Sequence, residues 1–310
     1  MNVKAAGSCP SPYQCDPVKN IPTLEQEPAP KETALTAKVT LLALKSIEES
    51  LLEKIDLLNE YILAKTLGLE ESSLLRLLEE YGSKITSLDI SDLPITNLSS
   101  ILTLCPNIQR LSAKDCALKA SDIDALKICY RLTYLDISCN SRISFLNLER
   151  NLSNLTNLTY LNIRSTNSGS GQLYWIRFLK KLEHLDVSYN FLQEGDTESI
   201  ATLRSLLYLD MQNCDLYMQS IPMLLTEHSK LKKLKYLDLS KNIVGKEDLG
   251  KIKEQMPTLE HLILRSSSIT YILPPLPNTL KTLDIRHNGL PGNDPLITCM
   301  QSDPKLSLLT

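Results

Sequence analysis

The stretch "LTYLDISCNSRI", residues 132–143, is followed by a near copy, "LTYLNIRSTNS", residues 158–168. In the first copy Leu135 and Ile137 alternate with polar side chains, which is the period of a β-strand with one apolar face. A strand this short cannot bury its apolar face alone. Repeated copies can do so, because stacked units form a parallel sheet that covers one continuous core.

The same apolar frame, LxxLxLxxNxL, aligns nine times along the chain. The copies begin at Ile85, Ile108, Leu132, Leu158, Leu182, Leu206, Leu234, Leu259 and Leu280. Subtraction of these starts gives intervals of 23, 24, 26, 24, 24, 28, 25 and 21 residues. Periods of 20–29 residues with this frame are the signature of leucine-rich repeats. Residues 85–290 therefore resemble the leucine-rich repeat family.

The resemblance implies an α/β fold, namely a leucine-rich repeat solenoid shaped as a horseshoe or arc. Its parallel β-sheet is expected on the concave face, with a mostly helical convex side. A polar side chain at the ninth frame position should satisfy backbone groups inside each bend. This position is filled by Asn140, Asn190, Asn242, Asn288, Cys116, Cys214, Thr166 and Ser267. The two cysteines are therefore expected to be structural. Leu93 at this position predicts a degenerate, capping first copy.

The rest of the chain suggests three regions. Residues 1–34 contain six prolines and few large apolar side chains, which predicts a disordered tail. Residues 35–82 are rich in Leu, Glu, Lys and Ala at helical spacing, which predicts two or three helices forming an N-terminal helical cap. Residues 83–310 form the predicted repeat domain, with about nine repeats and a C-terminal cap over residues 291–310.

The segments that return from one strand to the next look mostly helical. Helices are expected within residues 119–131, 170–181, 193–205 and 244–258, and a helix of two to three turns within 218–233. Pro274, Pro275 and Pro277 predict an extended crossing before the last copy. This last unit resembles the leucine-rich effectors that enteric bacteria secrete.

Composition narrows the function. The 310 residues carry a formal net charge of -3, which gives no reason to expect nucleic-acid binding. No apolar run approaches the roughly 20 residues that span a bilayer, so no membrane partner is expected. The N-terminus does not resemble a Sec signal peptide, and the eight cysteines lack zinc-site spacing. We expect free thiols and a cytoplasmic location, or secretion into a host cell by a non-Sec route.

The polar positions of the predicted strands give three columns on the concave face. The first column is mainly Tyr and His, the second mainly Asp, and the third mixes Ser with Arg and Lys. Tyr is enriched at recognition sites, and a ladder of Asp would favour a basic segment of a partner. The expected partner-binding residues are Tyr134, Asp136, Tyr160, Arg164, His184, Asp186, Tyr208, Asp210, Tyr236, Asp238, His261 and Arg265. In the simpler interpretation, Tyr stacks on its neighbours and Asp serves local hydrogen bonds.

The sequence therefore predicts a non-enzymatic module that binds another protein, with no catalytic residues, metal, cofactor or small-molecule substrate. In one form of this hypothesis the chain is a bacterial effector acting on a host protein. The alternative is a substrate-recognition adaptor of a ubiquitin ligase, with the helices of residues 35–82 as the docking element. Those residues lack the Leu-Pro pair and the Cys-x-x-Trp-like stretch of an F-box.

Overall fold

The structure is a computed structural model, and it describes residues 74–75, 78–79, 82–166, 173–216, 220–271, 273–290 and 306–309. The chain divides into two units, residues 1–34 and 35–310, and all described residues belong to the second. The predicted tail, most of the predicted helical cap and most of residues 291–310 lie outside the described ranges. From the cap region, Leu74 and Leu78 are helical and join the buried core.

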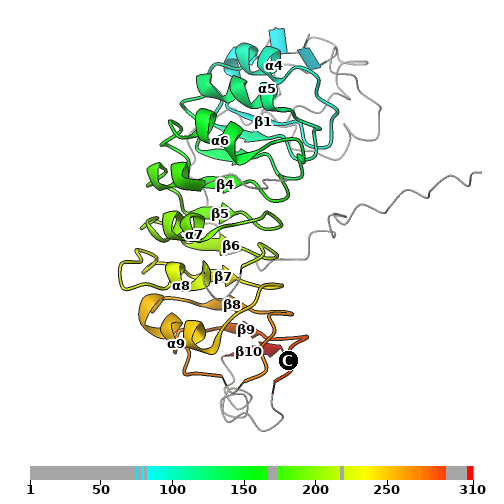
Figure 1. Cartoon of the computed structure of the whole chain (residues 1–310). Coiled ribbons are helices and arrows are strands. Elements are labelled where there is room, and N and C mark those ends of the chain that lie inside the picture. Colours follow the sequence, from blue (N-terminus) through cyan, green and yellow to red (C-terminus); the bar gives the residue numbers. More distant parts are fainter. Residues whose placement is uncertain are drawn as a thin grey trace, which may run out of the picture. The chain divides into compact units, whose positions relative to one another are not determined.

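One parallel sheet holds ten strands in chain order within the described residues. The strands are β1 Ser87–Asp89, β2 Arg110–Ser112, β3 Tyr134–Asp136, β4 Tyr160–Asn162, β5 His184–Asp186, β6 Tyr208–Asp210, β7 Tyr236–Asp238, β8 His261–Ile263, β9 Thr282–Asp284 and β10 Ser307–Leu309. Figure 1 shows these strands stacked in sequence order. Strands β1 to β9 fall in the nine copies of the frame, and each pairs with the next at equivalent positions, as Tyr134 does with Tyr160. The predicted α/β repeat solenoid is confirmed.

The apolar positions of the frame form the core. Leu135 and Ile137 are fully buried, and their counterparts in the other copies extend the same cluster from Leu74 to Ile285. Trp175, the single tryptophan of the chain, is also buried there. Because each repeat contributes only a thin layer, every unit depends on its neighbours to exclude water.

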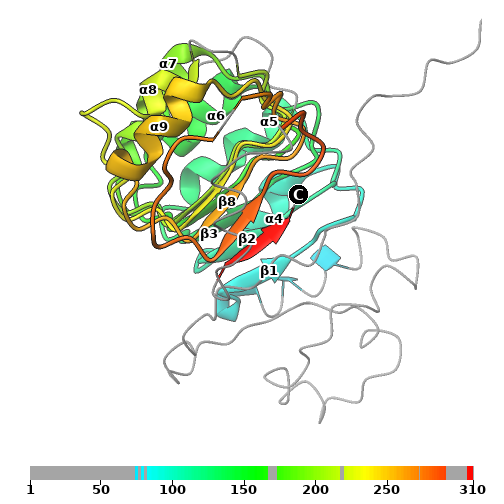
Figure 2. The same ribbon diagram turned by 90° about the horizontal axis from the view of Figure 1, so that it is seen from below.

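The returning segments cover the other side of the sheet. They contain α4 Leu98–Leu104, α5 Ala120–Ile123, α6 Phe145–Leu152, α7 Glu194–Ala201, α8 Ser220–Leu224 and α9 Lys246–Gln255, with 3-10 turns η4 Asp124–Ile128 and η5 Leu173–Phe178. Figure 2 shows α5 to α9 gathered on one side, with the strands on the other. The opposite side of the sheet, expected to be concave, is called the strand face below.

Several local expectations needed correction. The segment 119–131 contains the short helix α5 followed by a 3-10 turn, and the described part of 170–181 contains a 3-10 turn. The described helix α8 is shorter than the helix expected within 218–233. Helices α4 and α6 and strand β10 were not predicted. Short crossings favour tight 3-10 turns, because the chain must return to the sheet within few residues. The crossing that contains Pro274 has no helix among its described residues, as predicted.

A buried polar ladder holds successive repeats together. The side-chain amide of Asn140 donates to the carbonyls of Ala113 and Ile137 at 2.9 Å, and its oxygen accepts from the backbone N–H groups of Cys116 and Leu118 at 3.0 Å. The same pattern recurs at Asn190, Asn242 and Asn288. Where a shorter residue takes the position, as at Cys116, it donates to one carbonyl of the preceding repeat. This confirms the structural role predicted for the ninth frame position.

Candidate protein-binding surface

The aromatic column of the strand face is a continuous stack. Five rings, those of Tyr134, Tyr160, His184, Tyr208 and Tyr236, lie nearly parallel with successive centroids 4.0, 4.2, 3.9 and 4.2 Å apart. Parallel pairing in exact register brings them together, because each ring projects from the same position of adjacent strands. The predicted column is therefore assembled, and its rings first of all stabilise one another.

The two ends of the stack differ. The guanidinium of Arg110 covers the ring of Tyr134 at 4.1 Å from its centroid, a cation–π contact. At the other end the His261 ring is tilted by 40° from Tyr236, with the centroids 6.2 Å apart. His261 Nδ1 lies 3.1 Å from the hydroxyl of Thr282. The stack therefore breaks at His261.

His184 is neutral in this environment. Its ring lies between Tyr160 and Tyr208, and burial lowers its pKa to about 3. A charged imidazolium would lose its hydration between two rings without gaining a carboxylate partner. His184 thus acts as an aromatic plate rather than as a cation at neutral pH.

The aspartates beside the stack each accept a hydrogen bond from the backbone at the end of their own strand. Oδ1 of Asp136 accepts from the backbone N–H of Ser138 at 2.9 Å and from its hydroxyl at 2.7 Å. The same backbone bond is made by Asp186, Asp210 and Asp238 to the residue two positions later. Local hydrogen bonding, the simpler interpretation of this column, is therefore present in the structure.

Three of these aspartates also crowd one another. Asp186, Asp210 and Asp238 are direct neighbours in the register of β5, β6 and β7, and each is at most 9% exposed. Burial and the charges of Asp186 and Asp238 raise the pKa of Asp210 well above its ordinary value. Burial likewise raises the pKa of Asp238 to about 6. These three residues are called the acidic ladder below.

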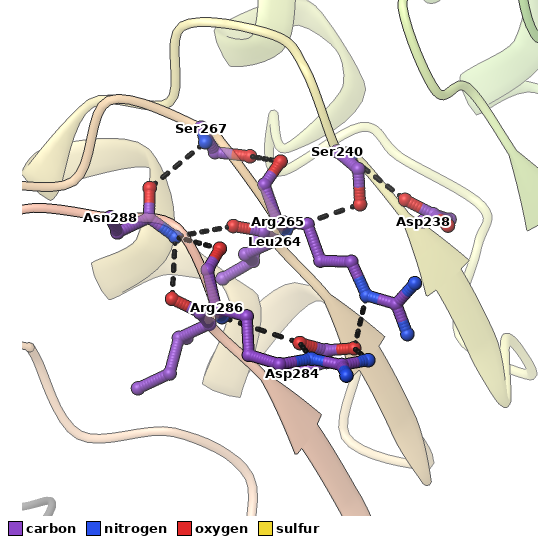
Figure 3. Close-up of polar contacts among 9 residues, drawn as sticks. Asp238, Ser240, Leu264, Arg265, Ser267, Asp284, Arg286 and Asn288 are labelled. Carbon is purple, nitrogen blue, oxygen red and sulfur yellow. Dashed lines mark hydrogen bonds and ion pairs between the residues drawn. The ribbon is translucent and has the colours of Figure 1, made fainter. Parts of the chain in front are cut away.

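Asp284, four frame copies after Asp186, has the opposite surroundings. Two guanidinium groups hold its fully buried carboxylate: Arg286 donates at 3.0 and 2.8 Å, and Arg265 donates from Nε (Figure 3). Hydrogen bonds from Arg286 and Arg265 outweigh burial and lower the pKa of Asp284. The same strand position is thus paired with two arginines in β9. In β5 to β7 the charges of Arg164 and Arg265 favour the ionised ladder, but no ion pair of the described chain includes its carboxylates.

The two predicted arginines are already engaged within the chain. Arg265 binds Asp284, while Arg164 donates to the Ser188 hydroxyl at 3.1 Å and lies 4.2 Å from the centroid of the Tyr189 ring. Lys241 reaches the same ring from a later repeat and donates to the Tyr189 hydroxyl at 3.1 Å. Tyr189 and Lys241 were not predicted, because their frame position forms the turn, where both residues have positive φ.

Among the described residues, no group of three or more His, Cys, Asp and Glu side chains is arranged to hold a metal ion. Within the same ranges, no helix has the length and apolar character needed to cross a membrane.

The stacked one-strand units, covered by short helices and joined by a buried asparagine ladder, define a parallel-strand solenoid. A family model described as "Leucine rich repeat" matches residues 156–216. Together, the repeat pattern, the sheet and this match show a leucine-rich repeat fold. None of the curated proteins compared with the chain matches its sequence.

Solved structures share the fold. An internalin, inlF, of Listeria monocytogenes is 20% identical, with a TM-score of 0.55 over 77% of this chain and 70% of that chain. Internalin C2 of the same organism is 18% identical, with a TM-score of 0.51 over 78% of this chain and 83% of that one. TLR13, solved in complex with ssRNA13, is 20% identical with a TM-score of 0.52, and the match covers 76% of this chain but 34% of TLR13. At these identities the likeness concerns the fold alone.

Proposed function

We propose that this chain is a non-enzymatic recognition module that binds a partner protein on its strand face. In this proposal the partner places a Lys or Arg side chain against the acidic ladder, and a neighbouring part of it rests on the aromatic stack. One observation carries the proposal. Asp186, Asp210 and Asp238 are held side by side in β5 to β7, whereas two arginines neutralise Asp284 at the same strand position.

The electrostatics favour such a ligand. Carboxylates about 5 Å apart repel by roughly 3 kcal/mol at an effective dielectric constant of about 20. Asp210 bears this repulsion from both sides, since Asp186 and Asp238 flank it and both raise its pKa. A cation placed over Asp210 would reverse the sign of the interaction, as Arg286 and Arg265 do at Asp284.

The aromatic stack complements this charge. Its rings are fixed by their neighbours, so a partner can bind them without ordering flexible side chains. Tyr134, Tyr160 and Tyr236 remain half-buried rather than covered, which leaves ring edges for contact. Rigid aromatic surface beside a charged site is typical of recognition hot spots.

The proposal extends to the role of a bacterial effector with a host protein as its partner. This extension is supported by the similarity of the proline-containing last unit, residues 271–290, to secreted leucine-rich effectors.

Affinity capture with three baits tests the proposal. Wild type should retain a partner at low salt and release it as salt rises, because the contact is ionic. The Asp186→Asn/Asp210→Asn/Asp238→Asn variant should lose that partner. A control, Glu198→Gln/Glu247→Gln/Glu254→Gln, changes the net charge equally but at exposed positions of α7 and α9, and it should bind as wild type does. Equal capture by the aspartate variant and wild type would count against the acidic ladder as the binding site.

A further inference from the structure

The turns that lead into the strands form a second surface, at one edge of the repeats. In each turn the residue that begins the frame donates its backbone N–H to the carbonyl three residues earlier, as Leu182 does to Leu179 and Leu234 to Leu231. Equal turn geometry and strict strand register place equivalent turn residues next to one another along the sheet. This surface is called the strand-entry edge below.

Three consecutive turns of this edge are strongly basic. The turns 177–181, 201–205 and 229–233 read "RFLKK", "ATLRS" and "SKLKK", and they contain no Asp or Glu. Their basic residues are Arg177, Lys180, Lys181, Arg204, Lys230, Lys232 and Lys233, and all of them are exposed. A chain with a net charge of -3 thus gathers seven cations at one edge.

Contacts within the chain leave these charges unneutralised. Lys180 donates to the Thr202 hydroxyl at 3.3 Å, Lys181 to Asn157 at 2.8 Å and Lys232 to Gln255 at 2.7 Å, all uncharged acceptors. In the described part of the chain no ion pair involves any of the seven. Their mutual repulsion is visible at Lys180, whose pKa is lowered by partial burial and by Arg204 and Arg177.

Large apolar side chains protrude from the same edge. Ile128 is 53% exposed, Tyr130 62% and Phe178 57%. Ile128 ends η4 and Phe178 ends η5, so they occupy equivalent positions two strands apart, a spacing of about 10 Å. Basic residues flank these apolar side chains in the sequence: "KICYR" spans 127–131, and "RFLKK" spans 177–181, two repeats later.

We propose that the strand-entry edge binds the surface of an anionic lipid bilayer. The apolar tips enter the boundary between headgroups and acyl chains, and the basic turns contact anionic headgroups. A nucleic acid or a wholly polar acidic peptide would match the charge but leave Ile128 and Phe178 in water, whereas a bilayer accommodates both features of the edge. No membrane partner was expected from the sequence, because no apolar run spans a bilayer. Binding at the bilayer surface requires no such run.

This surface is distinct from the strand face. The acidic ladder projects from the strands themselves, while the basic turns precede them in the chain. Attachment to a bilayer through the edge therefore leaves the strand face available, and the two proposals can fail separately.

Co-sedimentation of the full chain with lipid vesicles tests the inference. Wild type should sediment with vesicles of phosphatidylcholine and phosphatidylserine, and not with vesicles of phosphatidylcholine alone. The charge variant Lys180→Glu/Lys181→Glu/Lys232→Glu should weaken this binding roughly tenfold or more. The apolar variant Tyr130→Ala/Phe178→Ala should weaken it severalfold, including at raised salt, where the charges are screened.

A control reverses two charges elsewhere. Lys119→Glu/Lys246→Glu alters two exposed lysines at the starts of α5 and α9, where negative charge is tolerated, and should leave vesicle binding unchanged. Fluorescence of the buried Trp175 reports whether each variant is folded. Failure of wild type to sediment with phosphatidylserine vesicles would overturn the proposal, as would unchanged binding by the folded charge variant. Binding of poly-glutamate or a single-stranded oligonucleotide in place of vesicles would also overturn it.

Discussion

The guanidinium of Arg286 holds the buried carboxylate of Asp284 through two hydrogen bonds, 3.0 Å from Nε to Oδ1 and 2.8 Å from Nη2 to Oδ2. Four repeats earlier, Asp186 occupies the same strand position, yet its neighbour across the ladder is another carboxylate, Asp210. One frame position thus serves as an internal ion pair in one part of the sheet and as an anionic surface in another.

Replacing Asp210 by Asn should stabilise the free protein at pH 7. The Asn oxygen can still accept from the Gln212 N–H, while the repulsion from Asp186 and Asp238 disappears. The expected gain in the free energy of unfolding is on the order of 1–3 kcal/mol, since two carboxylates about 5 Å apart repel by roughly 3 kcal/mol. Urea denaturation followed by Trp175 fluorescence measures it, and a loss of stability in this variant would contradict the repulsion.

That gain should shrink on acidification. The folded-state pKa of Asp210 is raised, so the folded protein binds more protons than the unfolded chain between the ordinary carboxyl range and the raised values, about 6 for Asp238. The wild type therefore recovers stability relative to Asp210→Asn as pH falls through 6 toward 4. A difference between the two proteins that stays constant from pH 7 to 4 would show that the ladder does not titrate as described.

His184 should make the wild type less stable as pH falls, in contrast to Asp210, and replacing His184 by Tyr should remove this effect. The folded-state pKa of His184 is lowered to about 3, so the unfolded chain takes up a proton near pH 6.5 that the folded protein does not. The contribution of the neutral ring is present above pH 6.5 and is lost as pH falls below it. Tyr continues the stack without titrating in this range, so the variant should lose less stability than wild type between pH 7 and 4. Equal losses in thermal denaturation would contradict a neutral buried imidazole.

Removal of one asparagine from the buried ladder should be severe. Asn140→Ala deletes the donors to Ala113 and Ile137 and the acceptor for Cys116 and Leu118, all in a dry interior. At about 1–3 kcal/mol for each buried group left unsatisfied, a loss of at least about 3 kcal/mol is expected. Cys116→Ala, which removes a thiol donor only, serves as the comparison and should cost less. An Asn140→Ala variant no less stable than Cys116→Ala in urea would refute the ladder's role.

Tyr208 is the most buried ring of the aromatic stack, at 6% exposed, and lies between His184 and Tyr236. Tyr208→Ala should cost about 3 kcal/mol of stability through the cavity it leaves. Tyr208→Phe keeps the ring and should stay close to wild type. Calorimetric unfolding of both variants distinguishes ring packing from a contribution of the hydroxyl. Similar melting temperatures for the alanine and phenylalanine variants would contradict a stack held by its rings.

The sequence predicted the strand positions well, because the apolar frame is set by the core and repeats with little freedom. Leu135 and Ile137 fill positions that the core restricts to apolar side chains, and Asn140 fills one that in most copies holds a side chain able to hydrogen-bond the bend. Crossings were predicted less well, since segments such as 170–181 are apolar enough for a helix, whereas the described part of this one forms a 3-10 turn. Strand β10 was missed because residues 306–309, "LSLL", lack the rest of the frame.

The sequence predicted which residues share a column of the strand face. It did not predict their hydrogen bonds, ion pairs or pKa shifts. The columns of Tyr and Asp follow from the two-residue period alone. Whether Arg265 faces a partner or Asp284 depends on how side chains of two adjacent repeats pack together. The repeat pattern of the sequence does not specify this packing. The burial of Asp238 likewise depends on the rings and carboxylates of adjacent strands.

The pKa of Asp238 in the free protein and in its complex with the captured partner tests the central claim most directly. Carboxyl-carbon NMR titration of Asp238 should give a value of about 6 in the free protein. Bound to a partner that places Lys or Arg on the ladder, the same group should titrate well below that value, as the arginine-paired Asp284 does. An Asp238 pKa that is the same with and without the partner would contradict recognition through this ladder.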